Sequence, residues 1–177
     1  MKVLAFAGST SRQSINKQFV SYFSERIDSE ERELIDLNDF SMPIFSIDEE
    51  KENGIPTAAK VLYEKLQASE LIVISLAEHN GSYTAAFKNI FDWVSRHELN
   101  MFAEKKLILL STAPGARGGA GVMDAALDRF PRHGAEILGH FSLPKFHSNF
   151  DSTNGVIDPE LKEAFVSFLS TMNTKLQ

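Results

Sequence analysis

Short apolar runs alternate along this chain with segments of helical periodicity, and this alternation limits the possible folds more than any other feature. The runs that predict strands are residues 2–8, 32–37, 70–76, 105–111 and 134–141. The helical patterns cover residues 14–28, 56–69, 83–97, 119–132 and 158–175. Strands that alternate with helices form a parallel sheet whose two faces are covered by helices.

The polarity of the runs indicates their places in the sheet. Residues 3–7, 71–76 and 107–110 are continuously apolar, which is typical of strands buried on both faces, whereas residues 32–37 are more polar and suit an edge. We therefore expect a single α/β domain over residues 1–177, a flavodoxin-like three-layer sandwich with strand order 2-1-3-4-5. The stretch from Asn38 to Ile55 is expected to be irregular, either as a lid or partner loop or as a long crossover.

Composition excludes several classes of function. A net charge of −6 argues against a nucleic acid or an anionic membrane as partner. The absence of Cys excludes thiol catalysis, and no two of the five His have the i, i+4 spacing of a helical zinc site, so we expect no metal. The first apolar run is too short for a signal peptide, and no run is long enough for membrane insertion. A cytoplasmic protein is expected.

The segment after the first apolar run has the chemistry of a phosphate site. Residues 8–16 read GSTSRQSIN, which places four hydroxyls, a guanidinium and an amide where a helix is expected to begin. A helix start has unpaired N–H groups and the positive end of the helix dipole, so it suits an anion. Ser and Asn are also ordinary helix caps, and capping alone is the competing interpretation.

Two more unusual loops are expected at the same edge of the sheet, because ligands of open α/β sheets bind at the carboxyl ends of the strands. They are residues 77–83, AEHNGSY, and residues 111–119, STAPGARGG. Loops rich in Gly and Pro let backbone N–H groups approach a flat ligand closely. One anion loop and two such loops suit a flat ring with a phosphorylated tail, and flavin mononucleotide (FMN) is such a molecule.

The same three segments resemble the NADPH-dependent FMN reductases of the flavodoxin-like superfamily, which include quinone, chromate and azo-dye reductases. Residues 8–16 resemble the phosphate signature, Gly-Ser followed by Ser-x-Asn. Residues 77–96, AEHNGSYTAAFKNIFDWVSR, resemble the loop Pro-Glu-Tyr-Asn-Gly-Ser followed by Lys-Asn-x-x-Asp-Trp, and residues 111–119 resemble Ser-Pro-Gly-x-x-Gly-Gly. The chain departs from these patterns at Ala77, His79 and Ala113, and Arg12 lies one position later than the usual arginine.

The resemblance implies roles for named residues. The phosphate is expected to contact the start of the first helix, with Arg12 either paired to it or solvated. The phosphate residues are Ser9, Ser11, Ser14, Ile15 and Asn16. The ring is expected between two walls, one made of Glu78, His79, Asn80 and Gly81, the other of Thr112, Pro114, Gly115, Gly118 and Gly119. The competing interpretations are an ordinary turn for Asn80-Gly81 and an exposed loop residue for His79.

The expected function is an FMN-dependent oxidoreductase in which NADPH (or NADH) reduces the flavin and a small acceptor then takes the electrons. The acceptor is a quinone, an azo compound, free flavin or a metal oxyanion, and the cofactor carries the chemistry, so we expect no catalytic side chain. The resemblance also implies a homodimer or homotetramer built partly on the helix of residues 83–97. The alternatives are a flavodoxin-type electron carrier and a flavin-free regulatory domain that keeps the fold.

Overall fold

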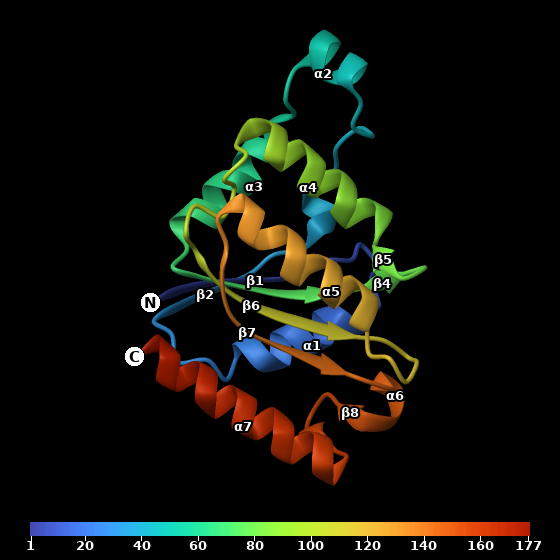
Figure 1. The fold of residues 1–177 in the computed structure, drawn as a ribbon, viewed down its shortest axis with the longest axis vertical. Coiled ribbons are helices and arrows are strands. Elements are labelled where there is room, and N and C mark those ends of the chain that lie inside the picture. The colour runs from blue at the N-terminus through green and yellow to red at the C-terminus, as the bar shows by residue number, and fades with distance from the viewer.

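The chain folds around a five-stranded parallel sheet in a computed structural model that describes residues 1–177 (Figure 1). The strands are β1 (Lys2–Ala7), β2 (Glu31–Leu34), β3 (Leu71–Leu76), β6 (Lys106–Thr112) and β7 (Glu136–Leu143). Their order is β2-β1-β3-β6-β7, and every pairing is parallel. The predicted order 2-1-3-4-5 and the flavodoxin-like fold are confirmed.

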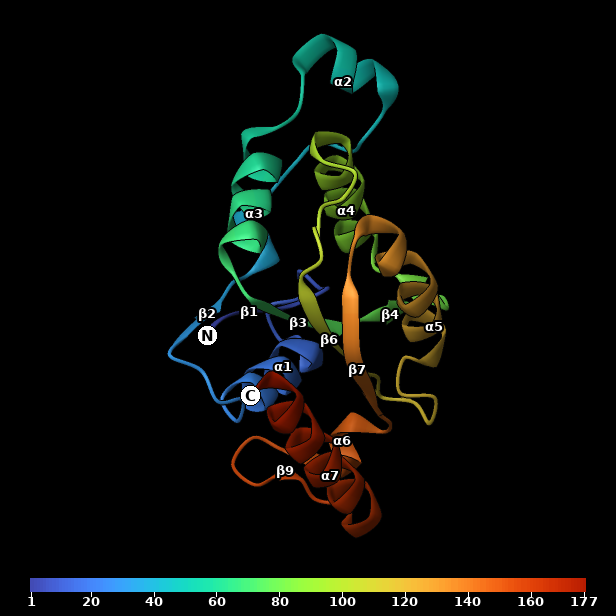
Figure 2. The same ribbon diagram turned by 60° about the vertical axis from the view of Figure 1, so that its left-hand side comes forward.

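Helices cover both faces of the sheet (Figure 2). On one face lie α1 (Ile15–Ser24) and α7 (Pro159–Leu176), and on the other lie α3 (Thr57–Ala68), α4 (Ala85–His97) and α5 (Ala120–Arg129). Alternate side chains of each central strand enter opposite cores. In β3, for example, Ile72 and Ile74 belong to the core under α3, α4 and α5, whereas Leu71 and Val73 belong to the core under α1 and α7. This two-sided burial is why the central strands are apolar at every position.

Two helices end earlier than the periodicity predicts. The first ends at Ser24, where the N–H groups of Arg26 and Ile27 turn back to Phe23 and Ser24 in tighter bonds. The helix expected at residues 119–132 is α5, which ends at Arg129. The chain continues as a 3₁₀ turn, η2 (Phe130–His133), because Pro131 lacks the N–H that an α-helix needs.

The expectation of an irregular segment between Asn38 and Ile55 is correct for residues 41–46 and wrong for the residues after them, which form a helix. This stretch contains part of a 3₁₀ turn, η1 (Leu37–Asp39), and a helix, α2 (Ile47–Asn53), which stands away from the body of the molecule (Figures 1 and 2). The Ser46 hydroxyl accepts the Glu49 N–H at 3.0 Å, and Gly54 ends the helix with a φ of 74°. The sequence carried this signal, because Ser-x-x-Glu is a capping box and Gly is the usual residue past a helix end.

Short elements follow two of the strands, β3 and β7. A hairpin, β4 (Glu78–His79) and β5 (Ser82–Tyr83), follows β3, and its turn is Asn80-Gly81, with φ values of 52° and 76°. After β7 come a short helix α6 (Phe146–Asn149) and a hairpin of β8 (Phe150–Asp151) and β9 (Gly155–Val156), which the sequence did not predict. None of the helices has both the length and the apolar character that a bilayer crossing requires.

Candidate functional site

A cavity of about 550 Å³ opens at the carboxyl ends of β1, β3 and β6. This is where the chain leaves β1 to one side for β2 and returns to the other side for β3, the switch point at which open α/β sheets bind ligands. The cavity is lined by Ser9, Ser11, Gln13, Ser14, Ile15, Asn16, Ala77, Glu78, His79, Thr112, Ala113, Pro114 and His147. All three loops that the sequence singled out therefore contribute to one cavity.

The start of α1 presents free hydrogen-bond donors to this cavity. The N–H groups of Ile15 and Asn16 have no acceptor within the chain, while the Ser14 hydroxyl accepts the N–H of Lys17 at 3.2 Å. The first turn of α1 contains no acidic residue, in contrast to α2, whose first turn has three. An anion at this helix start would thus meet open N–H groups and the positive end of the dipole without a competing carboxylate.

The Asn16 side chain makes three hydrogen bonds within the fold. Its Oδ1 accepts the Ser75 hydroxyl at 2.7 Å and the Thr112 N–H at 3.0 Å, and its Nδ2 donates to the Thr112 carbonyl at 3.0 Å. The residue is only 2% exposed. The side chain thus joins α1 to β3 and β6, which leaves the backbone N–H of Asn16 as the donor without an acceptor in this residue.

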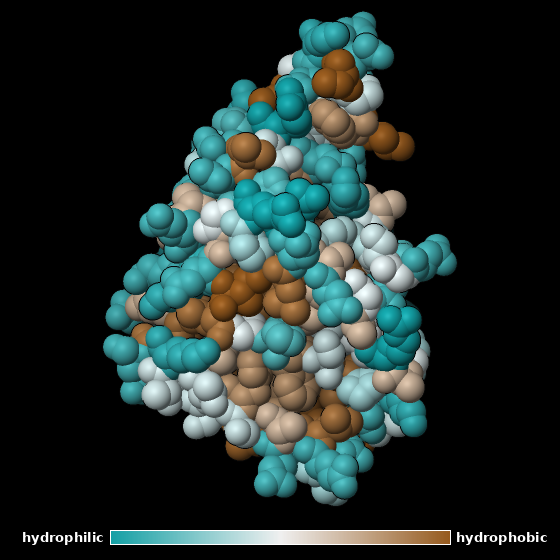
Figure 3. All heavy atoms as spheres, in the orientation of Figure 1, coloured by the Kyte–Doolittle hydropathy of each residue, from teal (hydrophilic) through white to brown (hydrophobic).

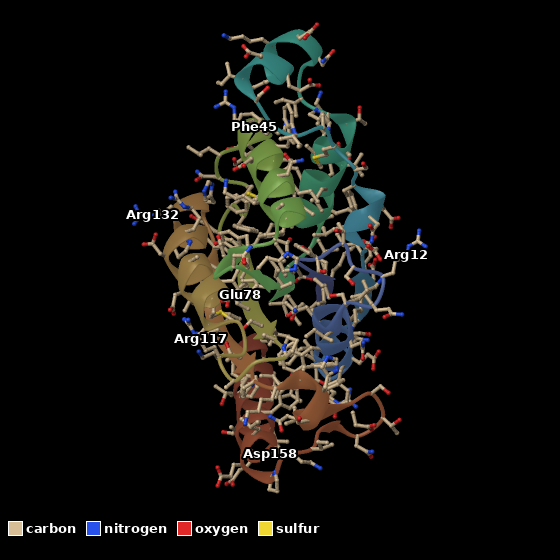
Figure 4. The ribbon with its side chains drawn as sticks, turned by 90° about the vertical axis from the view of Figure 1, so that its right-hand side faces the viewer. Arg12, Phe45, Glu78, Arg117, Arg132 and Asp158 are labelled. Carbon is tan, nitrogen blue, oxygen red and sulfur yellow. The ribbon has the colours of Figure 1, made fainter.

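Arg12 lies outside the cavity lining. Its side chain is exposed and points away from the body of the molecule, on the side opposite Arg117 in Figure 4. In this structure the guanidinium is therefore solvent-exposed. Gln13, which the sequence analysis did not select, lines the cavity instead.

The β4–β5 hairpin forms one wall through Ala77, Glu78 and His79. The Glu78 carboxylate accepts the Val122 N–H of α5 at 2.8 Å, so this side chain holds the hairpin against the start of that helix. His79 is exposed at the cavity margin. Asn80 and Gly81 form the hairpin turn and are not among the lining residues.

The loop after β6 forms the opposite wall through Thr112, Ala113 and Pro114. Gly115 is exposed beyond the lining, whereas Gly118 and Gly119 are buried beneath the loop. A Cβ at Gly118 would lie 3.0 Å from the Pro144 nitrogen, and the Ser111 hydroxyl donates to the Gly118 carbonyl at 2.8 Å. These two glycines support the loop from behind, because only Gly allows the close approach and the positive φ there.

His147 was missed by sequence reasoning. It lies in α6, 28 positions beyond the end of the third loop at Gly119, and no local motif marks it as a site residue. Only the packing of the segment after β7 against the loop after β6 brings it to the cavity. Ala77 and Ala113 also line the cavity, and they belong to loops that the sequence analysis had selected.

The cavity fits a phosphorylated flavin by shape and by donor set. Its volume lies within the range of about 300–1,000 Å³ that is usual for cofactor and small-molecule sites. Open N–H groups and hydroxyls gather at the α1 end, and two walls with small or backbone-presenting residues stand at the other. These are the requirements of a phosphate and of a flat ring, respectively.

Comparison with known proteins agrees with this geometry. The family model for NADPH-dependent FMN reductases matches residues 1–148. The probable NADPH:quinone oxidoreductase 2 of Oryza sativa is 25% identical over 97% of this chain and 87% of its own length. The NADPH:quinone oxidoreductase of Arabidopsis thaliana is 24% identical over 97% of this chain and 90% of its own length.

Solved structures share the fold. The flavoenzyme NAD(P)H:(acceptor) oxidoreductase FerB of Paracoccus denitrificans superposes with a TM-score of 0.76 at 19% identity, covering 98% of this chain and 95% of that one. The family match spans all three loops that build the cavity. The chain belongs to the NADPH-dependent FMN reductase family, and it is an NAD(P)H-dependent oxidoreductase with FMN as its flavin cofactor.

Proposed function

We propose that this enzyme carries out a two-electron, ping-pong reduction of a small acceptor, with a quinone as the first choice. The observation that carries the proposal is the open start of α1, where two N–H groups without acceptors face a cavity at the switch point of the sheet. The names of the plant relatives, which are quinone oxidoreductases, support the choice of acceptor.

Different residues of the cavity would bind the phosphate and the ring of FMN. Backbone N–H groups of Ile15 and Asn16, with the hydroxyls of Ser9 and Ser11, would hold the phosphate. Residues 77–79 and 112–114 would hold the ring between them, and backbone donors in the hairpin would stabilise negative charge on it. When bound, FMN supplies the redox chemistry, accepting hydride from NAD(P)H and delivering two electrons to the acceptor.

We propose a ping-pong order in which both substrates use one face of the flavin. The cavity lies at the ends of the strands beside the start of α1, and NAD(P)H and the acceptor would approach the bound flavin in turn from the side that faces solvent. Among the lining residues only Glu78, His79 and His147 are ionisable, and the Glu78 carboxylate is already bound to α5. We propose that the side chains of the cavity serve binding and orientation, and that the cofactor carries the chemistry.

We further propose that the enzyme works as a homodimer in which α4 takes part in the interface. A groove of about 490 Å³ lies between α4 and α5, lined in part by Lys88, Asp92 and Arg129. Lys88 and Asp92 form an ion pair at 2.7 Å along the helix, so they present a fixed charged surface to a partner.

The test of the proposed function is the absorbance spectrum of the purified protein, recorded with added FMN and then with anaerobic NADPH. Flavin bands that belong to the protein fraction and bleach with NADPH, and that return when a quinone is added, support the reductase. Flavin bands that do not bleach with NADPH would overturn the reductase and indicate an electron carrier instead. A protein that stays colourless with excess FMN would overturn the assignment of the cavity.

A further inference from the structure

The cavity has no permanent cation to meet a phosphate dianion. Neither Lys nor Arg is among its lining residues. Arg12 points to solvent, and the Lys17 ammonium is bound by the Asp36 carboxylate, whose pKa this hydrogen bond lowers. Among lining side chains only His79 and His147 are able to carry positive charge, and one carboxylate, Glu78, is present. A positively charged side-chain partner of the phosphate within the lining is therefore one of these two histidines.

His147 lies on a turn that is fixed to the loop after β6. The N–H of Lys145 donates to the Gly115 carbonyl at 3.0 Å, and the N–H of Phe146 donates to the Ala113 carbonyl at 3.1 Å. Asn149 closes the turn from the other end, its Nδ2 donating to the Pro144 carbonyl at 2.9 Å. The backbone that carries His147 is thus held in register with the cavity wall.

The turn lies on the α1 side of the sheet. Phe146 is buried and stacks on Phe150 with ring centroids 4.8 Å apart, and Phe150 meets Phe19 of α1 edge-on at 5.9 Å. His79 belongs instead to the hairpin that Glu78 joins to α5, on the opposite side. Of the two histidines, His147 is therefore the one that shares a side with the open N–H groups of α1.

We propose that the His147 imidazole is an additional cofactor-binding group that donates a hydrogen bond to the phosphate of FMN. It would complete the phosphate site from the side facing the α1 start, as a fourth segment beside the three loops. A hydrogen bond to a charged group is worth more than a neutral one, so a single imidazole makes a measurable contribution. This inference rests on the proposed binding of FMN in the cavity.

The experiment compares the dissociation constants of FMN and of riboflavin, which has the same ring and ribityl chain but no phosphate. We would measure both by flavin fluorescence for the wild-type protein and for His147→Ala, His147→Gln and His140→Ala. His140 is an exposed residue of β7 outside the cavity and serves as the matched control. Circular dichroism and thermal melting would check that each variant is folded, as expected for exposed side chains.

We expect His147→Ala to weaken FMN binding by about tenfold and to leave riboflavin binding unchanged. His147→Gln keeps an N–H donor and should recover part of the FMN affinity, while His140→Ala should match the wild type. Equal weakening of both ligands, or no weakening of either, would overturn the inference while leaving the proposed function intact. A wild-type protein that binds FMN no better than riboflavin would also overturn it, and one that binds neither would overturn both proposals.

Discussion

The buried hydroxyl of Tyr83 lowers the stability of this fold. Its hydroxyl is buried and has no hydrogen-bond partner, and the ring lies within the aromatic cluster of Phe87 and Phe130. Burial raises the pKa of Tyr83 to about 12, because the charged form is poorly solvated there. The hydroxyl therefore costs free energy of folding that a phenyl ring would not.

We expect Tyr83→Phe to raise the free energy of unfolding by about 1 kcal/mol, since an unsatisfied polar group is removed and the ring packing is kept. The pH dependence gives a second signature. Between pH 10, where an unfolded tyrosine ionises, and about pH 12, the folded protein retains the proton, so wild-type stability falls as pH rises through this window. The variant should lack this component of the alkaline decline.

Urea unfolding from pH 7 to pH 11 would measure both effects. Tyr22→Phe is the matched control, because the Tyr22 hydroxyl donates to the Asn154 carbonyl at 3.3 Å and its removal should not stabilise the protein. A Tyr83→Phe protein that is less stable than wild type at pH 7 would show that the hydroxyl has a partner in solution, such as a bound water.

At the scale of elements, the contact between α5 and the β4–β5 hairpin decides the shape of the cavity. Gly121 lies in the first turn of α5, and a Cβ there would be 2.9 Å from Glu78 Oε2 and 3.1 Å from the Gly81 carbonyl. The last glycine of the motif GARGGAG is thus required by the hairpin that packs on it, rather than by a ligand.

We expect Gly121→Ala to displace the hairpin and weaken FMN binding by about tenfold, although Ala favours a helix more than Gly does by about 1 kcal/mol. Fluorescence titration with FMN and a thermal melt of the same sample would separate the two effects. Ala120→Gly is the control, because it weakens the helix start without adding an atom against the hairpin. If Ala120→Gly lost FMN affinity to the same degree, the clash would not be the cause.

At the scale of the whole molecule, the segment around α2 is an arm (residues 44–55) attached to the body mainly through α4. The Trp93 Nε1–H donates to the Pro43 carbonyl at 2.8 Å, Phe45 packs edge-on against Trp93 at 5.0 Å, and Arg96 binds Glu50 at 2.9 Å. The helix α2 itself has no buried residue. Figure 3 shows hydrophobic side chains exposed at the arm end of the molecule, and Ile44 is 86% exposed.

An arm that buries so little contributes little to the core. We expect replacement of residues 46–54 by a short Gly-Ser linker to lower the melting temperature by only a few degrees, because neither core loses a fully buried side chain. Calorimetry would measure this, and sedimentation equilibrium on the same samples would report the mass.

The same pair of measurements tests the proposed homodimer. A truncated protein that remains folded but becomes monomeric would place the exposed isoleucines of the arm in the interface. A dimer that persists would restrict the interface to α4 and its neighbours, and a monomeric wild type would remove the dimer proposal. A large loss of melting temperature would instead mean that the arm stabilises the fold.

A structural element could be predicted from the sequence where the residues that determine it lie close together in the chain. The continuous apolar strands, the hydroxyl-rich start of α1 and the Asn-Gly turn each depend on neighbours within a few residues, so their positions were predictable. The capping box of α2, from Ser46 to Glu49, is an equally local signal for a helix start. The helix ends at Ser24 and Arg129 were less predictable, because apolar periodicity extends past the point where the backbone bonds change.

Alternating strands and helices allow few arrangements, so the order of the sheet, the burial of its central strands and the meeting of three loops at one edge could be predicted from the sequence. Which atoms face the cavity depends on tertiary contacts. Asn16 directs its amide to Thr112 and Ser75, Gly118 lies beneath its loop, and His147 reaches the site from a distant segment. These outcomes depend on contacts between residues far apart in sequence, which no local pattern encodes.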